Sequence, residues 1–90
     1  MSEKEANKGE ETFDEIKYLL GNMGIEILFA IDRGAKIIET IKLFSGIPIR
    51  CVKGRLPVLL ELSLIKREKD EYFLTDKGNI LKTMLKNANL

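Results

Sequence analysis

Three basic side chains lie close together in the second half of the sequence, at Arg50, Lys53 and Arg55. Cations at this density can neutralise nucleic-acid phosphates, and each such contact makes binding more sensitive to salt. Arg50 and Lys53 are three positions apart, so they share one face if the segment is helical. The alternative is that the three charges only form the solvated face of a helix.

A second basic group, Lys66, Arg67 and Lys69, is interleaved with an equal number of acidic residues and therefore carries little net charge. It can touch a phosphate backbone, or it can be only the tip of a structural hairpin. Lys36 and Lys42 can also reach phosphates, although plain solvent exposure is the commoner role of such lysines.

The residues that most enzymes use are missing or isolated. There is no histidine, which removes the commonest general base and the commonest metal ligand. A glycine-rich phosphate loop, a metal-spaced ligand set and a nucleophile elbow are missing too. The single cysteine, Cys51, lies among cations, where redox sensors occur, but a small residue filling a helix N-terminus is commoner. We therefore expect neither an enzyme nor a metal or cofactor site.

Length and charge indicate one domain with an acidic tail. Ninety residues suffice for a single modest core. Residues 1–15 hold six acidic residues and two lysines, whereas the other 75 hold 13 basic and 8 acidic residues, so the net charge of +1 hides a mildly basic body. We expect 1–11 to be a disordered acidic tail and 12–90 to be the folded domain.

Apolar runs are short, and none approaches the roughly 18 residues of a membrane span. The acidic N-terminus does not have the pattern of an export or transit signal, so we expect a cytoplasmic protein. Abundant Lys, Glu and Ile, with no Gln or Trp, are typical of thermophiles and favour an archaeal source.

The spacing of apolar residues predicts helices before the basic cluster. Thr12, with Glu15 three residues later, has the pattern of a capping box and starts a helix that runs to about Leu20. A second helix is predicted over Met23–Arg33, and a single helix bent across Gly21–Gly24 is the alternative.

The basic cluster follows a predicted turn between two helices. A helix over Lys36–Ser45 ends at Gly46, which supplies a left-handed residue. Ile47 and Pro48 make the turn, because proline keeps the residue before it extended. The next helix has an apolar stripe formed by Val52, Leu56, Leu59 and Leu62.

That second helix contains Pro57, which cannot donate a backbone hydrogen bond and clashes with the carbonyl of Lys53, at about 3 kcal/mol. Either the helix kinks at this proline, or its regular part begins near Leu56 and Arg50–Arg55 is a turn. The remaining chain predicts two short strands around a turn at 69–70, and a last helix, capped by Thr75, over 76–87.

Three stretches agree with one family in their order and spacing: SGIP at 45–48 leading into Val52, Arg55 and Leu59, LLELSLI at 59–65, and YFLTDKG at 72–78. The first stretch resembles the turn and the recognition helix of winged helix-turn-helix regulators, especially archaeal ones. The second resembles the LEELGLI ending of that helix. The third resembles the Y-x-L-T-x-x-G motif that follows the wing in these proteins. The resemblance implies a mainly α fold with a small β-hairpin, in which an N-terminal and a C-terminal helix flank the winged helix-turn-helix core.

The resemblance also implies a transcription regulator that binds double-stranded DNA. The helix after the turn would lie in the major groove, where arginine can bond guanine bidentately, and a short wing would contact the flanking backbone. The DNA-binding residues expected on this basis are Arg50, Cys51, Lys53, Gly54, Arg55, Lys66, Arg67 and Lys69. The alternative is a winged-helix module that binds protein without specific DNA binding.

Members of this family often dimerise through their terminal helices, and two-fold symmetry matches paired half-sites on DNA. Phe13 and Leu20 are seven residues apart, as an intermolecular helical seam requires. We therefore expect a homodimer whose seam includes Phe13, Ile16, Leu20, Leu81, Met84 and Leu85, although ordinary packing within one chain explains the same residues.

Overall fold

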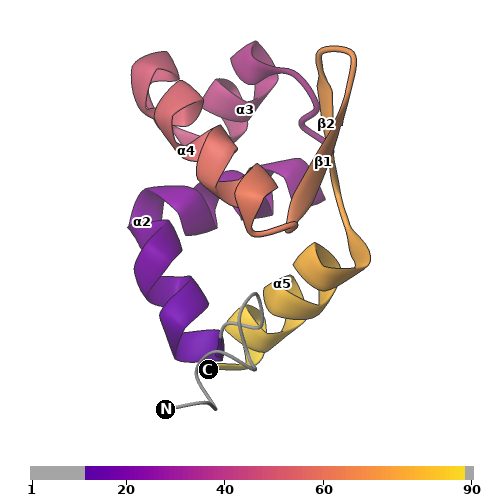
Figure 1. Cartoon of the computed structure of the whole chain (residues 1–90). Helices are drawn as coiled ribbons and strands as arrows, with labels where there is room; N and C mark the ends of the chain where they lie inside the picture. The colour runs from indigo at the N-terminus through magenta and orange to yellow at the C-terminus, as the bar shows by residue number, and fades with distance from the viewer. Residues whose placement is uncertain (1–11, 89–90) are drawn as a thin grey trace.

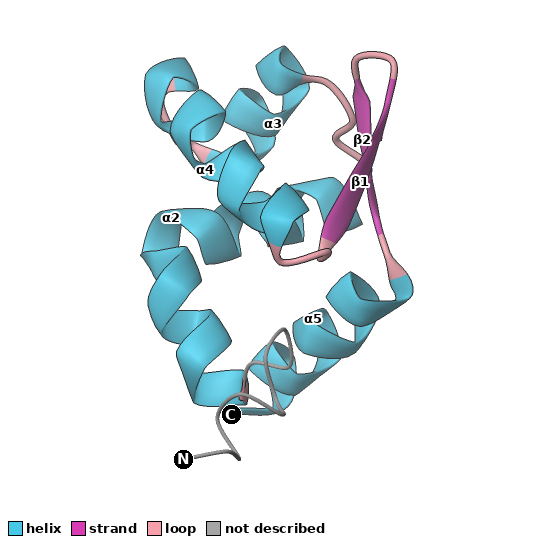
Figure 2. Cartoon of the chain, in the orientation of Figure 1, coloured by secondary structure: helices cyan, strands magenta, loops and turns pink. Residues whose placement is uncertain are grey.

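The computed structural model describes residues 12–88, and within this range it is mainly helical with one β-hairpin (Figures 1 and 2). The elements, in chain order, are α2 (Phe13–Asp32), α3 (Ile38–Ser45), α4 (Ile49–Glu61), β1 (Ile65–Glu68), β2 (Glu71–Leu74) and α5 (Asp76–Ala88). The prediction of a mainly α fold with a small hairpin is confirmed. The predicted acidic tail, 1–11, lies outside the described residues.

Helix α2 begins with the predicted capping box. The hydroxyl of Thr12 accepts from the backbone N–H of Glu15 at 3.1 Å, and the Glu15 carboxylate accepts from the N–H of Thr12 at 3.0 Å. Gly21, with φ 67° and ψ 178°, breaks the helical geometry within α2, and the second half follows without a loop. Such a φ strains any residue with a Cβ, so the glycine is what permits the bend. The bent form that we gave as the alternative is therefore the one observed.

The bent α2 packs against all three other helices, and most extensively against α4. Leu20, Ile27 and Leu28 of α2 are fully buried together with Ile41 of α3 and Leu59 of α4. Burying each such side chain contributes about 1.5–3 kcal/mol, so this contact is the main stabilising feature of the domain. Figure 1 shows α5 beside the N-terminal half of α2, at the end of the molecule away from the hairpin tip.

Four of the six residues predicted to form an intermolecular seam belong to this core instead. Ile16, Leu20, Leu81 and Leu85 are all buried within the chain. Helix α5 is also tied to the end of α2 by Lys82, whose Nζ lies 3.0 Å from an Asp32 carboxylate oxygen. The apolar spacing of the four buried seam residues therefore reflects packing of α2 on α5 within one chain.

Helix α3 starts at Ile38, two residues later than predicted. The carbonyl of Lys36 accepts a hydrogen bond from the N–H of Tyr72 in β2, at 2.8 Å, so the start of the predicted helix is extended and paired with the hairpin. The end of α3 is as predicted, because Gly46 adopts the left-handed conformation with φ 75°.

Helix α4 runs without interruption through Pro57, so the alternative start near Leu56 is wrong and Arg50–Arg55 is helical. Pro57 is exposed, and so is Lys53, whose carbonyl loses its usual donor. Water can therefore replace the missing hydrogen bond. Burial of Leu56 and Leu59 on the opposite face holds the helix together across the proline.

The hairpin forms around the predicted two-residue turn at 69–70. Its strands pair antiparallel, from Ile65 opposite Leu74 to Glu68 opposite Glu71. The hydroxyl of Thr75 then caps α5, as predicted, by accepting from the N–H of Gly78 at 3.0 Å. The same hydroxyl donates to the carbonyl of Ser63 at 2.6 Å, which fixes the start of α5 against the end of α4.

Candidate nucleic-acid interface

The first half of α4 presents its basic residues on the side away from the core. Arg50, Lys53 and Gly54 are exposed, whereas Val52 is fully buried on the opposite face. Since α4 is helical from Ile49 onward, the three-residue spacing does place Arg50 and Lys53 on one face.

The remaining predicted α4 residues flank this face. Cys51 and Arg55 are half-buried. None of the hydrogen bonds or ion pairs found among residues 12–88 involves the side chains of Arg50, Lys53 or Arg55. These charged groups are therefore not committed to holding the fold.

The N-terminus of α4 adds to the positive potential around them. Pro48, at the N-cap position, makes no side-chain cap, and the first turn contains no acidic residue. An uncapped helix N-terminus leaves backbone N–H groups and the positive end of the helix dipole open to an anion. Arg50 lies in this first turn, so its charge and the dipole act in the same direction.

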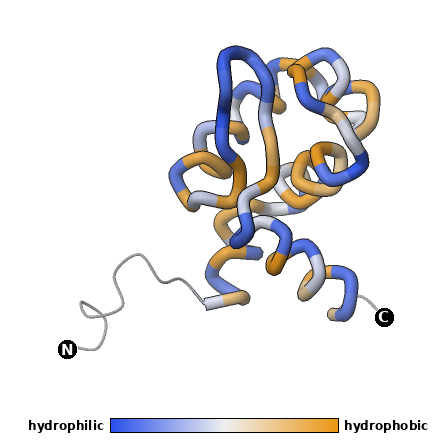
Figure 3. Tube along the Cα trace, turned by 90° about the vertical axis from the view of Figure 1, so that its right-hand side faces the viewer, coloured by the Kyte–Doolittle hydropathy of each residue, from blue (hydrophilic) through white to orange (hydrophobic). Residues whose placement is uncertain are grey.

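The hairpin cations differ from those of α4, because two of the three interact within the hairpin. Lys66 lies 3.7 Å from the Glu68 carboxylate. Arg67 donates through Nε to the carbonyl of Lys69 at 2.7 Å and lies over the ring of Tyr72. Figure 3 shows a hydrophilic hairpin tip. The hairpin is therefore a weaker candidate for anion contact than α4.

A shallow hollow joins α4 to the hairpin tip. Its volume is about 310 Å³, and it is lined by Ile37, Ile38, Glu39, Ile49, Lys53 and Asp70. Lys53 thus shares one surface with a residue of the turn at 69–70, although the two are distant in the sequence. We did not predict Glu39 or Asp70 as site residues, and no sequence signal points to them, because folding alone brings them to Lys53.

The other basic residues considered above lie outside this surface. The Lys36 Nζ lies 5.7 Å from the centroid of the Phe73 ring, where a cation–π contact holds it beside β2. Lys42 lines a separate hollow of about 380 Å³ at the turn before α4, together with Leu43, Ile47 and Pro48 among others.

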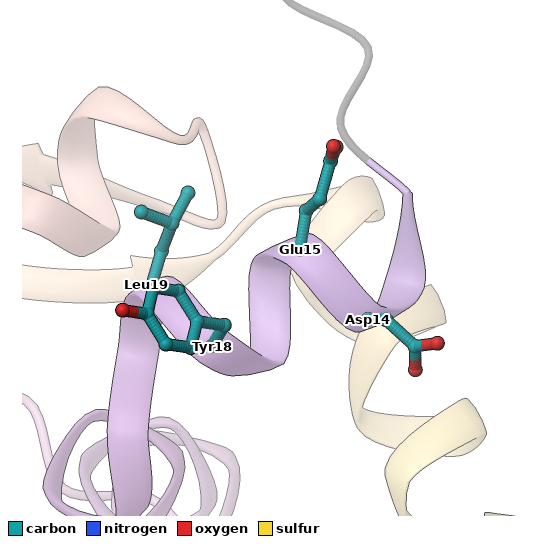
Figure 4. A pocket seen from close by; sticks show the side chains of 4 residues that line it. All are labelled: Asp14, Glu15, Tyr18 and Leu19. Carbon is teal, nitrogen blue, oxygen red and sulfur yellow. The ribbon is translucent and has the colours of Figure 1, made fainter.

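A further hollow, of about 420 Å³, lies on the outer side of α2 (Figure 4). It is lined by Asp14, Glu15, Tyr18 and Leu19, and Figure 4 shows the two carboxylates pointing away from each other. Its charge repels a polyanion. Within residues 12–88, no group of three or more His, Cys, Asp or Glu side chains is arranged to hold a metal ion.

Among residues 12–88, no helix has both the length and the apolarity needed to cross a membrane. A scan against models of protein families finds none that matches the sequence, and a search of curated proteins finds no significant match.

Proposed function

We propose that the chain is a winged helix-turn-helix transcription regulator that binds double-stranded DNA, with α4 as its recognition helix. The observation that carries the proposal is the pair Arg50 and Lys53, exposed and uncommitted beside the uncapped start of α4. The order of α3, turn, α4 and hairpin supports the proposal. So does the backbone hydrogen bond from the N–H of Tyr72 to the carbonyl of Lys36, which anchors the wing to the segment before α3.

In this proposal α4 enters the major groove with its N-terminal half. Arg50 bonds a guanine edge bidentately, and Lys53 neutralises a phosphate. Cys51 and Gly54 are small enough to let the helix approach the base edges, while Arg55 reaches a phosphate at the margin. The wing contributes less, mainly through Lys69. Such a protein works in the compartment that holds the genome, which in an archaeon is the cytoplasm.

Binding to a fluorescent duplex tests this function. We expect the protein to bind at low salt and the logarithm of its affinity to fall by about 0.9 per decade of salt for each phosphate contact, hence by about two to three in total. Complexes with selected genomic duplexes should also persist when nonspecific DNA is added as a competitor. The proposal is wrong if the anisotropy at low salt shows no preference for duplex over single-stranded DNA.

Docking of another protein is a second candidate function, and the surface before α4 favours it. Leu43, which lines the hollow at Ile47 and Pro48, is 74% exposed, and its neighbour Phe44 is 44% exposed. Two adjacent exposed apolar side chains beside such a hollow suit contact with a protein partner. Loss of partner binding in Leu43→Glu, with duplex binding unchanged, would assign this surface to protein.

We also propose that the protein is a homodimer through α2 and α5, along exposed residues of which only Met84 belongs to the predicted seam. Tyr18, Leu19 and Met23 of α2, and Ile80 and Met84 of α5, are exposed. Sedimentation should show a dimer that dissociates on dilution, and Tyr18→Glu with Ile80→Glu should weaken it about 10-fold or more. A monomer at every concentration would contradict this proposal.

A further inference from the structure

The hollow between α3, α4 and the hairpin tip has the composition of a small-molecule site. Ile37, Ile38 and Ile49 supply an apolar lining, and Ile37 is 37% exposed despite its aliphatic side chain. A volume of about 310 Å³ is at the lower end of the roughly 300–1,000 Å³ typical of ligand pockets. The space therefore suits a small ligand with an apolar group.

Charges of both signs surround this apolar lining. Lys53 contributes a cation, and Glu39 and Asp70 contribute two carboxylates. None of the three side chains takes part in a hydrogen bond or an ion pair within the described range 12–88. Although they line the same hollow, they do not neutralise one another, so a ligand that carries both charges can bridge them.

We propose that this hollow binds a free α-amino acid with a branched aliphatic side chain. Its carboxylate pairs with Lys53, its ammonium group lies between Glu39 and Asp70, and its side chain packs on the isoleucines. A simple anion would meet two carboxylates, and a simple cation would meet Lys53. A zwitterion satisfies both signs, and its aliphatic group removes apolar surface from water.

A regulatory consequence follows, and it rests on the proposed DNA-binding function. The amino-acid carboxylate and a DNA phosphate compete for the charge of Lys53, and the two anions repel each other when both are close to it. The ligand should therefore lower duplex affinity several-fold and reduce the salt slope by about 0.9. By linkage, the duplex should lower the affinity for the amino acid by the same factor.

Nuclear magnetic resonance titration of the full chain with L-leucine tests the site directly. We expect saturable shifts at 37–39, 49–53 and 70, with a dissociation constant on the order of 1 mM for so small a ligand with exposed ionic partners. Isocaproate lacks the ammonium group of leucine and isoamylamine lacks its carboxylate. Isocaproate loses the ammonium contacts with Glu39 and Asp70 and isoamylamine loses the carboxylate contact with Lys53, so each should bind about five-fold more weakly.

Matched variants separate the hollow from general charge effects. Lys53→Met and Asp70→Asn should each weaken leucine binding about five-fold or more, whereas Lys42→Met and Glu26→Gln, at exposed positions outside the hollow, should not. Ile37→Ser should also weaken binding while keeping the fold, because position 37 is the N-cap of α3, has extended geometry and makes no side-chain cap.

The outcomes distinguish the site from the DNA-binding function. Absence of saturable shifts with leucine overturns the site, whatever the protein does with DNA, and so does equal binding of isocaproate or isoamylamine. Leucine binding without any effect on duplex affinity supports the site and overturns the regulatory coupling. Leucine binding by a protein that does not bind duplex at all supports the site and overturns the DNA-binding proposal.

Discussion

Reversal of both charges in Arg50→Glu/Lys53→Glu is expected to lower the affinity for duplex DNA by at least about 100-fold at low salt. Arg50→Glu removes the guanine contact, Lys53→Glu removes the phosphate contact, and each new carboxylate is repelled by the phosphates. The slope of log affinity against log salt should become shallower by about 0.9, since Lys53 makes the one phosphate contact of the pair. Fluorescence anisotropy over a series of salt concentrations measures both quantities.

The same double variant should remain folded, because both side chains are exposed and neither belongs to the core. Glutamate in the first turn of α4 interacts favourably with the helix dipole, so Arg50→Glu should not weaken the helix. A circular dichroism melt close to that of the parent protein would show that the loss of affinity is a loss of contacts.

A control with the same change in net charge is Lys17→Glu/Lys86→Glu. Lys17 lies over the Phe13 ring on α2, and Lys86 lies 3.9 Å from Asp32 on α5, so both are outside the proposed interface. We expect this control to bind duplex within about three-fold of the parent, through long-range charge alone. An equal loss of duplex affinity in both double variants would mean that α4 makes no specific contact with DNA.

Local signals gave the most reliable structural predictions. The capping box of Thr12 and Glu15, the left-handed Gly46 and the Thr75 cap all depend on residues within one helical turn of each other, and all three are confirmed. The two-residue turn at 69–70 is a similar case. At the three helix ends a short side chain or a glycine satisfies nearby backbone groups, so the cause lies within a few residues of the sequence.

Predictions that depended on distant partners were less successful. The Lys36 carbonyl pairs with Tyr72 of β2, and local helix propensity does not take such a bond into account. The break suggested at Pro57 did not occur, because packing of Leu56 and Leu59 against the core stabilises α4 across the proline. Tertiary packing overrode the local rule in both cases.

In the candidate site too, features with a local cause were predictable and features that depend on distant residues were not. The spacing of Arg50 and Lys53 was sufficient to place them on one face of a helix. The neighbours of Lys53 were not predictable, since Glu39 comes from α3 and Asp70 from the hairpin turn. Nor could the sequence show that Arg67 is held by the carbonyl of Lys69 and is therefore less available for an anion.

The contact between α5 and the end of α4 leads to the second large effect, at Gly78. This buried glycine lies in the first turn of α5, against the carbonyl of Leu64. A Cβ at position 78 would overlap that carbonyl oxygen and would lie 3.1 Å from its carbon. Leu64 is fully buried, and its carbonyl also accepts from the N–H of Thr75 at 3.1 Å, so the oxygen is held in place.

Gly78→Ala is therefore expected to destabilise the protein by about 3 kcal/mol or more, although alanine is the better helix former by about 1 kcal/mol. To relieve the overlap, α5 has to move away from Leu64, which breaks the hydrogen bonds of Thr75 to Leu64 and to Ser63. For a domain of this size, Tm in a thermal melt should fall by about 12–24 °C.

The matched control for this substitution is Gly54→Ala, which makes the same chemical change in another helix. A Cβ at position 54 has open space around it, and the residue is solvent-exposed in the middle of α4. The free energy of unfolding of this variant should therefore rise by about 0.5–1 kcal/mol. A loss of stability in Gly78→Ala together with a gain in Gly54→Ala would show that the loss at position 78 arises from the close approach of α5 to Leu64. A Gly78→Ala protein as stable as the parent would mean that α5 does not pack against Leu64 in this way.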